Sequence, residues 1–228
     1  MIYENEYAKV DFFDWEPIQK CKKVGLAISG GTDSALVLYM LCNELKHKNY
    51  DYEIVLFTLV QDSQPMVQHI VMDVVDIIRD MFPEVNVPTP LFTHWGGDVH
   101  NEHMGNKKVN SSREFKKKLI AEGKIDSILS GRNLITFATA EEQATYGLDT
   151  LRVEPRPSIM RDGIPHYEPL SITDKKFVAK VYEDEGLLET LFPHTISCTG
   201  NAQDTDYFTK VCEKCWSCQE RKWAFGVH

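Results

Sequence analysis

A short polar stretch near the start of the chain separates two apolar segments, and it constrains the fold more than any other feature. Residues 23–28, KVGLAI, form an apolar run with the length of a buried strand. Residues 34–47, SALVLYMLCNELKH, carry apolar side chains at helical spacing. Between them the chain reads Ser-Gly-Gly-Thr-Asp-Ser over residues 29–34. A buried strand that passes directly into a helix through two glycines predicts a strand–turn–helix unit of an α/β domain.

The same alternation of strand and helix continues along the chain. Strands are predicted at residues 52–60, 90–95 and 126–131, and helices at residues 65–82, 111–123 and 133–147. This order indicates an α/β fold: a parallel five-stranded sheet with helices on both faces. Ser111 or Ser112 is expected to cap the helix at 111–123, and residues 96–110 are expected to form a long polar loop.

The composition of the sequence changes after residue 150, where prolines become frequent. Residues 150–170 contain four prolines and are expected to form a loop. A further helix is predicted over residues 173–191, with Thr173 as its cap. The chain is therefore divided into an N-terminal arm (1–22), an α/β domain (23–170) and a helical C-terminal segment (171–228).

Four of the six cysteines gather near the C-terminus. Cys198 is followed by thirteen residues and then by Cys212-x2-Cys215-x2-Cys218. Four thiolates at this spacing are typical of a tetrahedral structural zinc site, which leaves no coordination position open for a substrate. A small zinc-binding subdomain is therefore predicted. The alternatives are buried free thiols or a redox pair, which would leave two cysteines unexplained.

The composition restricts the possible partners and location. Lys and Arg number 25 against 34 Asp and Glu, which gives a formal net charge of −9. An acidic chain does not favour tight binding to nucleic acid, which depends on clustered Lys and Arg. No apolar run reaches the roughly 20 residues that span a bilayer, and the N-terminus lacks the pattern of a signal peptide. A cytoplasmic location without membrane contact is expected.

The turn at residues 29–34 is suited to bind phosphate groups. It is expected at the carboxyl end of a parallel strand, where ligands bind to open α/β sheets, and it begins a helix whose first N–H groups attract anions. The glycines allow close approach of the backbone, and the hydroxyl groups add donors. The candidate nucleotide-binding residues are Ser29, Gly30, Gly31, Thr32 and Ser34.

Asp33 in the same turn would repel phosphate unless a divalent cation lay between them. This favours a nucleoside triphosphate with Mg²⁺. The alternative is a capped strand–helix turn without a ligand. The sequences G-x-x-x-x-G-K-[ST] and G-x-G-x-x-G, which mark other phosphate-binding turns, are absent.

The sequence S-G-G-x-D-S after a strand resembles the signature of the PP-loop ATP pyrophosphatases. This resemblance implies the adenine nucleotide alpha hydrolase-like fold and cleavage of ATP between its α- and β-phosphates. Such enzymes adenylate an oxygen of their substrate and release pyrophosphate. The turn and Asp33 would then hold pyrophosphate and magnesium respectively.

The turn and the cysteine cluster together resemble the 7-cyano-7-deazaguanine synthase family of queuosine biosynthesis. Residues 168–199 and the segment ILSGRNLI at residues 128–135 are also similar to that family. The resemblance implies an AMP-forming ATP-dependent C–N ligase. It would adenylate the carboxylate of 7-carboxy-7-deazaguanine and use ammonia to form the amide and then the nitrile. ATP, Mg²⁺ and structural zinc are the implied cofactors, and a homodimer is expected.

Further site residues follow from the resemblance. Lys175 would neutralise the phosphates, unless it is an ordinary surface lysine. Thr58 and Leu59 would meet adenosine through their backbone. Arg132 and Asn133 would lie beside ATP or the substrate, although Arg132 is also compatible with a loop surface. His69, His94, His100 and His103 are not expected to form a site.

The family's base-binding stretch is replaced here by TFATAEEQATYGLDTLRVEPRPSIM, in which Arg152 or Arg156 could serve a similar purpose. Two other functions therefore stay open. One is a related PP-loop ATP pyrophosphatase that adenylates another acceptor, in the modification of a nucleic acid or a protein. The other is a non-catalytic nucleotide-binding or assembly protein.

Overall fold

The computed structural model describes residues 1–48, 50–62, 64–95, 102–136, 154–200, 203–207 and 209–228. Within this part of the chain, six strands form one sheet in the order β5-β4-β3-β6-β8-β7. The parallel strands are β3 (Lys23–Ala27), β4 (Glu53–Gln61), β5 (Leu91–Trp95), β6 (Ser127–Ser130) and β8 (Ile164–Tyr167). Strand β7 (Ser158–Arg161) lies antiparallel at the edge. The predicted α/β fold with five parallel strands is confirmed.

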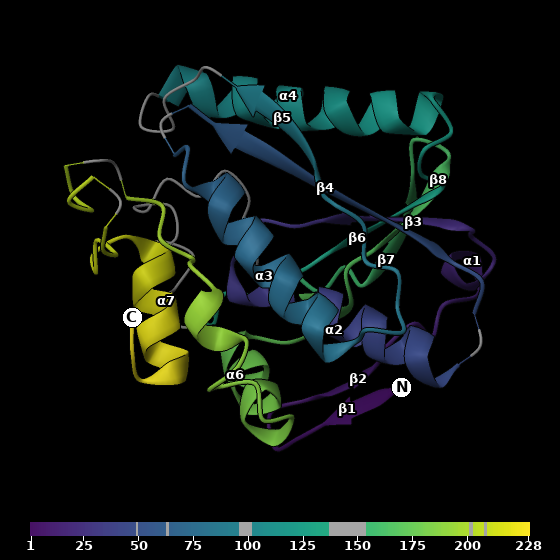
Figure 1. Ribbon diagram of the computed structural model, residues 1–228, viewed down its shortest axis with the longest axis horizontal. Helices are drawn as coiled ribbons and strands as arrows, with labels where there is room; N and C mark the ends of the chain where they lie inside the picture. The colour runs from purple at the N-terminus through teal and green to yellow at the C-terminus, as the bar shows by residue number, and fades with distance from the viewer. Residues whose placement is uncertain (49, 63, 96–101, 137–153, 201–202, 208) are drawn as a thin grey trace.

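Helices cover both faces of this sheet (Figure 1). Helices α2 (Thr32–His47) and α3 (Val67–Met81) lie on one face, and α4 (Glu102–Ala121) lies on the other. Helices α6 (Lys175–Asp184) and α7 (Trp216–Phe225) pack against each other next to the α2 side. None of the helices in the described residues combines the length and the apolar character needed to cross a membrane.

The apolar core follows from the alternation of side chains along the strands. Leu26 and Leu56 belong to the large core on the face of α2 and α3, whereas Phe57 and Ile128 belong to a smaller cluster beneath α4. Both faces are apolar because a parallel sheet is buried on both sides. The sheet therefore separates two apolar clusters, a large one beneath α2 and α3 and a smaller one beneath α4.

The expected loop at residues 150–170 contains a β-hairpin instead. Strands β7 and β8 are joined at Asp162 and Gly163, whose φ angles of 52° and 81° are both positive. Two central residues with positive φ are the requirement of a tight type I′ turn, and Asp-Gly is a common sequence for it. The loop prediction was wrong here because it relied on the prolines and overlooked this dipeptide.

The largest differences from the predicted helix boundaries occur in α4 and α6. Helix α4 begins at Glu102, so residues 102–110 are helical and neither Ser111 nor Ser112 is a cap. The helix continues through Gly105, since one internal glycine costs only about 1 kcal/mol relative to alanine. Helix α6 is capped by Asp174 rather than Thr173, because the Asp174 carboxylate accepts hydrogen bonds from two backbone N–H groups of the first turn.

Helix α6 is also shorter than predicted and ends at Asp184. Gly186, with a φ of +69°, follows it in the left-handed conformation that ends many helices. Of the helix predicted at residues 133–147, residues 133–136 are not helical, and residues 137–147 lie outside the described residues.

Residues 1–22 contain the strands β1 (Ile2–Glu4) and β2 (Lys9–Asp11) and the short helix α1 (Glu16–Gln19). β1 and β2 pair as a separate antiparallel sheet. Phe12 and Phe13 are fully buried against the main core. The Tyr167 hydroxyl accepts a hydrogen bond from the Phe13 N–H at 3.0 Å and donates one to the Asp11 carbonyl at 3.2 Å. The arm is thus fastened to strand β8 by aromatic packing and by hydrogen bonds.

Replacement of Phe12 by alanine tests whether the arm folds as part of this core. We expect the free energy of unfolding in urea to fall by about 3–5 kcal/mol, the usual cost of removing a buried phenylalanine ring. Ile2→Ala is the control, because the Ile2 side chain is largely exposed, and little change is expected there. A loss below about 1 kcal/mol for Phe12→Ala would mean that the arm is not part of the cooperative unit.

Candidate functional site

The glycine-rich turn (residues 29–34) connects β3 to the first residue of α2 and is held by its own hydroxyl groups. The Ser34 hydroxyl accepts from the Ser29 N–H at 3.1 Å and donates to the Gly31 carbonyl at 3.1 Å. Gly30 has a φ of +77°, which side chains rarely adopt, and a Cβ there would come within 2.6 Å of Ile70. The turn therefore requires glycine at Gly30 for both its backbone conformation and its packing.

A second close approach brings the end of β6 onto the start of α2. A Cβ at Gly131 would lie 2.6 Å from the backbone of Asp33 and of Ser34. Only a glycine lets the two backbones meet in this way. The consequence is that the first N–H groups of α2 are fixed at the carboxyl end of the sheet, where ligands bind in open α/β folds.

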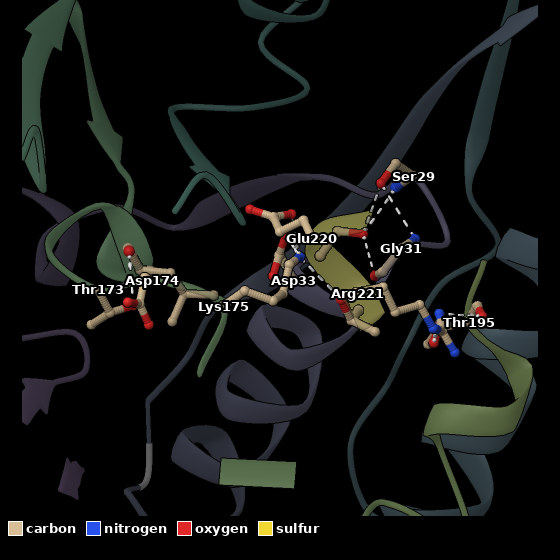
Figure 2. Close-up of polar contacts among 12 residues, drawn as sticks. Ser29, Gly31, Asp33, Thr173, Asp174, Lys175, Thr195, Glu220 and Arg221 are labelled. Atoms are coloured by element: carbon tan, nitrogen blue, oxygen red, sulfur yellow. Dashed lines mark hydrogen bonds and ion pairs between the residues drawn. The ribbon is translucent and has the colours of Figure 1, made fainter. Parts of the chain in front are cut away.

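A buried lysine lies directly behind the turn. Lys175, the first residue of α6, is almost fully buried and forms ion pairs with Asp33 and, at 3.3 Å, with Glu220 of α7. Its ammonium also donates to the Thr32 hydroxyl at 3.3 Å. Figure 2 shows Lys175 between the two carboxylates. Burial alone would lower the pKa of Lys175, but attraction to Asp33 and Glu220 outweighs it and holds the pKa above its ordinary value.

The charge balance of Lys175, Asp33 and Glu220 favours the binding of an additional cation. Two carboxylates face one ammonium, so the trio carries one excess negative charge in a buried place. The Asp33 oxygen Oδ1 is buried and has no hydrogen-bond partner among the described residues. A buried carboxylate oxygen without a partner is costly, and carboxylate oxygens are preferred ligands of Mg²⁺. The residues present therefore fit a divalent cation at Asp33.

The turn opens onto a cavity of about 700 Å³. Its walls come from the turn, the ends of β4 and β6, the start of α3, the helix α4 and the cysteine segment. Of the predicted site residues, those that line it are Ser29, Gly31, Asp33, Ser34, Thr58, Leu59, Arg132, Lys175 and Cys198. The others, Gly30, Thr32, Asn133, Cys212, Cys215 and Cys218, are not part of its lining.

Positive charge lies at the α4 end of the cavity. Arg132 lines it and pairs with Glu168 at 3.3 Å, so it is not an isolated surface residue. Lys116 also lines it, and burial lowers the pKa of this lysine, although Glu168 offsets part of the effect. Asn133, by contrast, is completely buried and does not line the cavity. Of the two residues predicted here, Arg132 alone reaches the cavity.

The four cysteines form a compact cluster. Their sulfur atoms all lie within 4.8 Å of one another, so the group could hold a metal ion. The Cys198 sulfur accepts hydrogen bonds from the N–H groups of Gly200 and Cys212 at 3.3 and 3.2 Å. Cys215 is the N-cap residue of α7 and Cys218 lies in its first turn. The cysteine cluster therefore includes the start of that helix.

Crowding of the sulfur atoms affects their ionisation. Contact with Cys215 raises the pKa of Cys198 to about 11, and contacts with Cys198 and Cys215 raise that of Cys218. The pKa of Cys215 is lowered by its contacts with Cys198 and Cys218. One thiol ionises readily, but its negative charge hinders ionisation of the neighbouring thiols. A bound cation would offset this repulsion between thiolates. The donor set thus fits a thiolate-binding metal.

The cluster is joined to the glycine-rich turn through the backbone. The Ile196 N–H donates to the Gly30 carbonyl at 2.9 Å, two residues before Cys198. Arg221 of α7 fixes the same segment, since its guanidinium donates to the Thr195 carbonyl at 2.7 Å. The segment that carries the first cysteine therefore lies directly against the turn.

The remaining candidates do not gather at this cavity. His69 and His94 are exposed on α3 and β5 and do not line it. Arg156 is paired with Glu154 on the surface at 3.3 Å. His100 and Arg152 lie outside the described residues, and only the backbone of His103, in α4, is described.

Sequence reasoning missed Gly131, Lys116 and Glu220. Gly131 precedes Arg132 at the end of a predicted strand, where a glycine often marks close approach of another backbone, so a signal was present. Lys116 and Glu220 lie in helices among many other charged residues. Nothing in the local pattern distinguishes them from solvent-exposed side chains.

The chain has a structural neighbour among known proteins, but no match to a protein family or to a curated sequence. No protein-family model matches the chain, and no curated protein matches its sequence. Among solved structures, the chain is similar in shape to the U34-tRNA thiolase NcsA from Methanococcus maripaludis with its 4Fe-4S cluster. The identity is 15% and the TM-score is 0.48, and the match covers 74% of this chain. This chain spans 58% of the length of that one.

Gly131→Ala tests the contact between β6 and the start of α2. The added methyl group must push against backbone atoms, so we expect a loss of about 1–3 kcal/mol in the free energy of unfolding. Amide hydrogen exchange at Asp33 and Ser34 should also become faster. Gly123→Ala is the control: a Cβ there meets nothing within 4 Å, and only its positive φ is strained. Unchanged exchange at Asp33 and Ser34 in Gly131→Ala would contradict the close contact.

Proposed function

We propose that this chain is an ATP pyrophosphatase of the PP-loop type that adenylates an acceptor and releases pyrophosphate. The observation that carries the proposal is the ion pair between the buried Lys175 and the partly buried Asp33, at a glycine-rich turn that opens onto the cavity. A turn without a ligand does not need a buried ammonium behind it, because burying a charge is costly. A site that binds a ligand with several negative charges does need such an ammonium.

The turn supplies the groups that hold phosphate oxygens. Ser29, Gly31 and Asp33 line the cavity where α2 begins, so the first N–H groups of that helix would lie close to a bound phosphate. A helix start of this kind attracts anions through its free N–H groups and its dipole. The Ser34 hydroxyl is used within the turn, so its role is to shape the turn rather than to bind the ligand directly.

Asp33 would hold Mg²⁺ through the oxygen that lacks a hydrogen bond. Magnesium bound to phosphate oxygens neutralises their charge and makes pyrophosphate a better leaving group. Lys175 adds a fixed positive charge next to the same place. Together these groups would stabilise the negative charge that develops when pyrophosphate leaves.

Thr58 and Leu59 line the cavity at the end of β4 and would meet the adenosine part of ATP. The Thr58 hydroxyl already donates to the Ile28 carbonyl at 2.6 Å. The hydroxyl proton is therefore already used, and contact with adenosine is proposed through the backbone.

For the acceptor we propose 7-carboxy-7-deazaguanine, a small purine-like molecule with a carboxylate. The cationic end of the cavity, with Lys116 and Arg132, supports an anionic acceptor, and Phe115 offers apolar surface for a planar ring. The carboxylate oxygen would bond to the α-phosphorus of ATP as pyrophosphate leaves. Ammonia would then displace AMP to give the amide. A second ATP would activate the amide oxygen with release of pyrophosphate, and loss of AMP and of both protons on the nitrogen would leave the nitrile.

No side chain needs to act as a nucleophile in this sequence, because substrate oxygen and ammonia form the new bonds. The chain's own residues bind, orient and neutralise charge, which can account for a large part of such a rate enhancement. For the cysteine cluster we propose a closed structural zinc site, with all four sulfur atoms as ligands. A homodimer is proposed as the assembly.

One assay separates this function from its alternatives. The protein is incubated with ATP, Mg²⁺, ammonium and 7-carboxy-7-deazaguanine, and AMP and the product masses are followed. Formation of the nitrile supports the proposed ligase. AMP formation that requires another acceptor, such as transfer RNA or a protein, supports a related ATP pyrophosphatase. ATP binding without AMP formation under any condition supports a non-catalytic nucleotide-binding protein.

Asp33→Asn tests the proposed role of the carboxylate in this assay. The amide keeps the shape of the side chain but loses its charge for Mg²⁺ and Lys175. We expect AMP formation to fall by at least about 100-fold, in line with the removal of one electrostatic contact at a reacting group. Far-ultraviolet circular dichroism should stay unchanged. Asp73→Asn, an exposed change on α3, is the control, and a fully active Asp33→Asn variant would exclude the magnesium role.

Metal analysis tests the zinc site. We expect one zinc ion per purified chain, with Cys218→Ser reducing the zinc content and the melting temperature, because binding of a structural metal contributes directly to folding. Cys21→Ser is the control, since the Cys21 thiol lies outside the cluster and donates to the Pro17 carbonyl. A well-folded wild-type protein without any bound metal would rule the zinc site out.

A further inference from the structure

The third partner of Lys175 comes from the metal-binding helix. Glu220 follows Cys218 by two residues in α7, and its side chain is 3% exposed. Its oxygen Oε2 lies 3.3 Å from the Lys175 ammonium. Neither the glycine-rich turn nor the cysteine cluster requires a carboxylate at this place. A buried glutamate there needs its own explanation, because it is tolerated only when it is paired.

The three partners together use the full donor capacity of the ammonium. A lysine ammonium has three N–H donors and sits on a flexible stem. The three acceptors are the Thr32 hydroxyl, the Asp33 carboxylate and the Glu220 carboxylate. Two of them belong to the start of α2, and the third approaches from α7 (Figure 2). The ammonium is thus held from two separate elements.

This arrangement matters most when ligands are bound. Because Asp33 would share its charge with a cation, its hold on Lys175 weakens at the moment when phosphate groups attract the same ammonium. Glu220 would then keep Lys175 at a fixed place. A lysine that moved freely to the phosphates would bind them in the ground state without being aligned for the transition state.

We infer that Glu220 is a positioning residue that holds Lys175 at the glycine-rich turn and connects the four-cysteine centre to nucleotide chemistry. The connection runs from Cys218 along one half-turn of α7 to Glu220, and from there to Lys175 and Asp33. Arg221, next in the chain, anchors the same helix turn to Thr195. The inference rests on the proposed function, since it assigns a role within the same site.

The test is Glu220→Gln, which keeps the size and the acceptor oxygen but removes the charge. We expect MgATP to bind at least as tightly as to the wild type by calorimetry, because Lys175 is freed to meet the phosphates. AMP formation should nevertheless fall by about 10- to 100-fold, the scale of a small misplacement at a reacting centre. Zinc content should stay at one ion per chain.

The matched control is Glu213→Gln, an exposed glutamate between Cys212 and Cys215. It should change neither the MgATP affinity nor the rate. A second comparison uses Lys175→Gln alone and combined with Glu220→Gln. If Glu220 acts through Lys175, the second change adds no further loss of AMP formation, whereas independent effects would multiply.

Three results would overturn the inference: wild-type rates in Glu220→Gln, MgATP binding weakened together with zinc loss, or multiplying losses in the double variant. The second of these would reveal a role confined to holding the structure together. Failure of the wild type to form AMP with any acceptor would overturn the proposed function instead. In that case two measurements on the Glu220→Gln variant, its MgATP affinity and its zinc content, decide whether Glu220 restrains Lys175.

Discussion

The buried ammonium of Lys175 is the interaction on which the arrangement of the site depends. An isolated charge in a protein interior costs several kcal/mol, so the folded chain must surround it with acceptors. The acceptors come from residues 32 and 33 on one side and from residue 220 on the other. Three elements that are far apart in the sequence, α2, α6 and α7, are brought together around one nitrogen atom.

The parallel sheet explains why this contact lies at the edge of a cavity. The carboxyl ends of β3, β4 and β6 lie side by side, so the chain leaves the sheet at neighbouring points of the same edge. Gly131 lets the end of β6 press against the start of α2, and the Ile196 N–H closes the turn from the other side. The turn is therefore fixed from two directions before any ligand arrives, which is the preorganisation that electrostatic stabilisation requires.

The sequence was informative where a local rule applied. Residues 23–47 could be predicted as strand, turn and helix because glycines interrupt two apolar runs. The spacing of the four cysteines likewise indicated a metal-binding cluster. At residues 158–167 the prolines led to a loop prediction, although the Asp-Gly dipeptide indicated a hairpin. At residues 102–110 the polar composition led to a loop prediction for a segment that is helical. Glu220 could not be found at all. Its meaning depends on Lys175, 45 residues earlier, and burial is a property of the assembled chain rather than of a short window.

In the proposed function, the acceptor would be selected by charges from several elements rather than by one motif. The glycine-rich turn and Lys175 would contact the phosphates alone, so they are compatible with any acceptor that offers an oxygen. What can distinguish acceptors is the far end of the cavity, where Lys116 and Arg132 lie near Glu168. Because Glu168 already pairs with Arg132, the three residues carry one excess positive charge, and an acceptor carboxylate there would gain from it whereas a neutral acceptor would not. The discrimination expected from this end therefore favours a small anion, and it arises from residues 116, 132 and 168, which no single segment of the sequence contains.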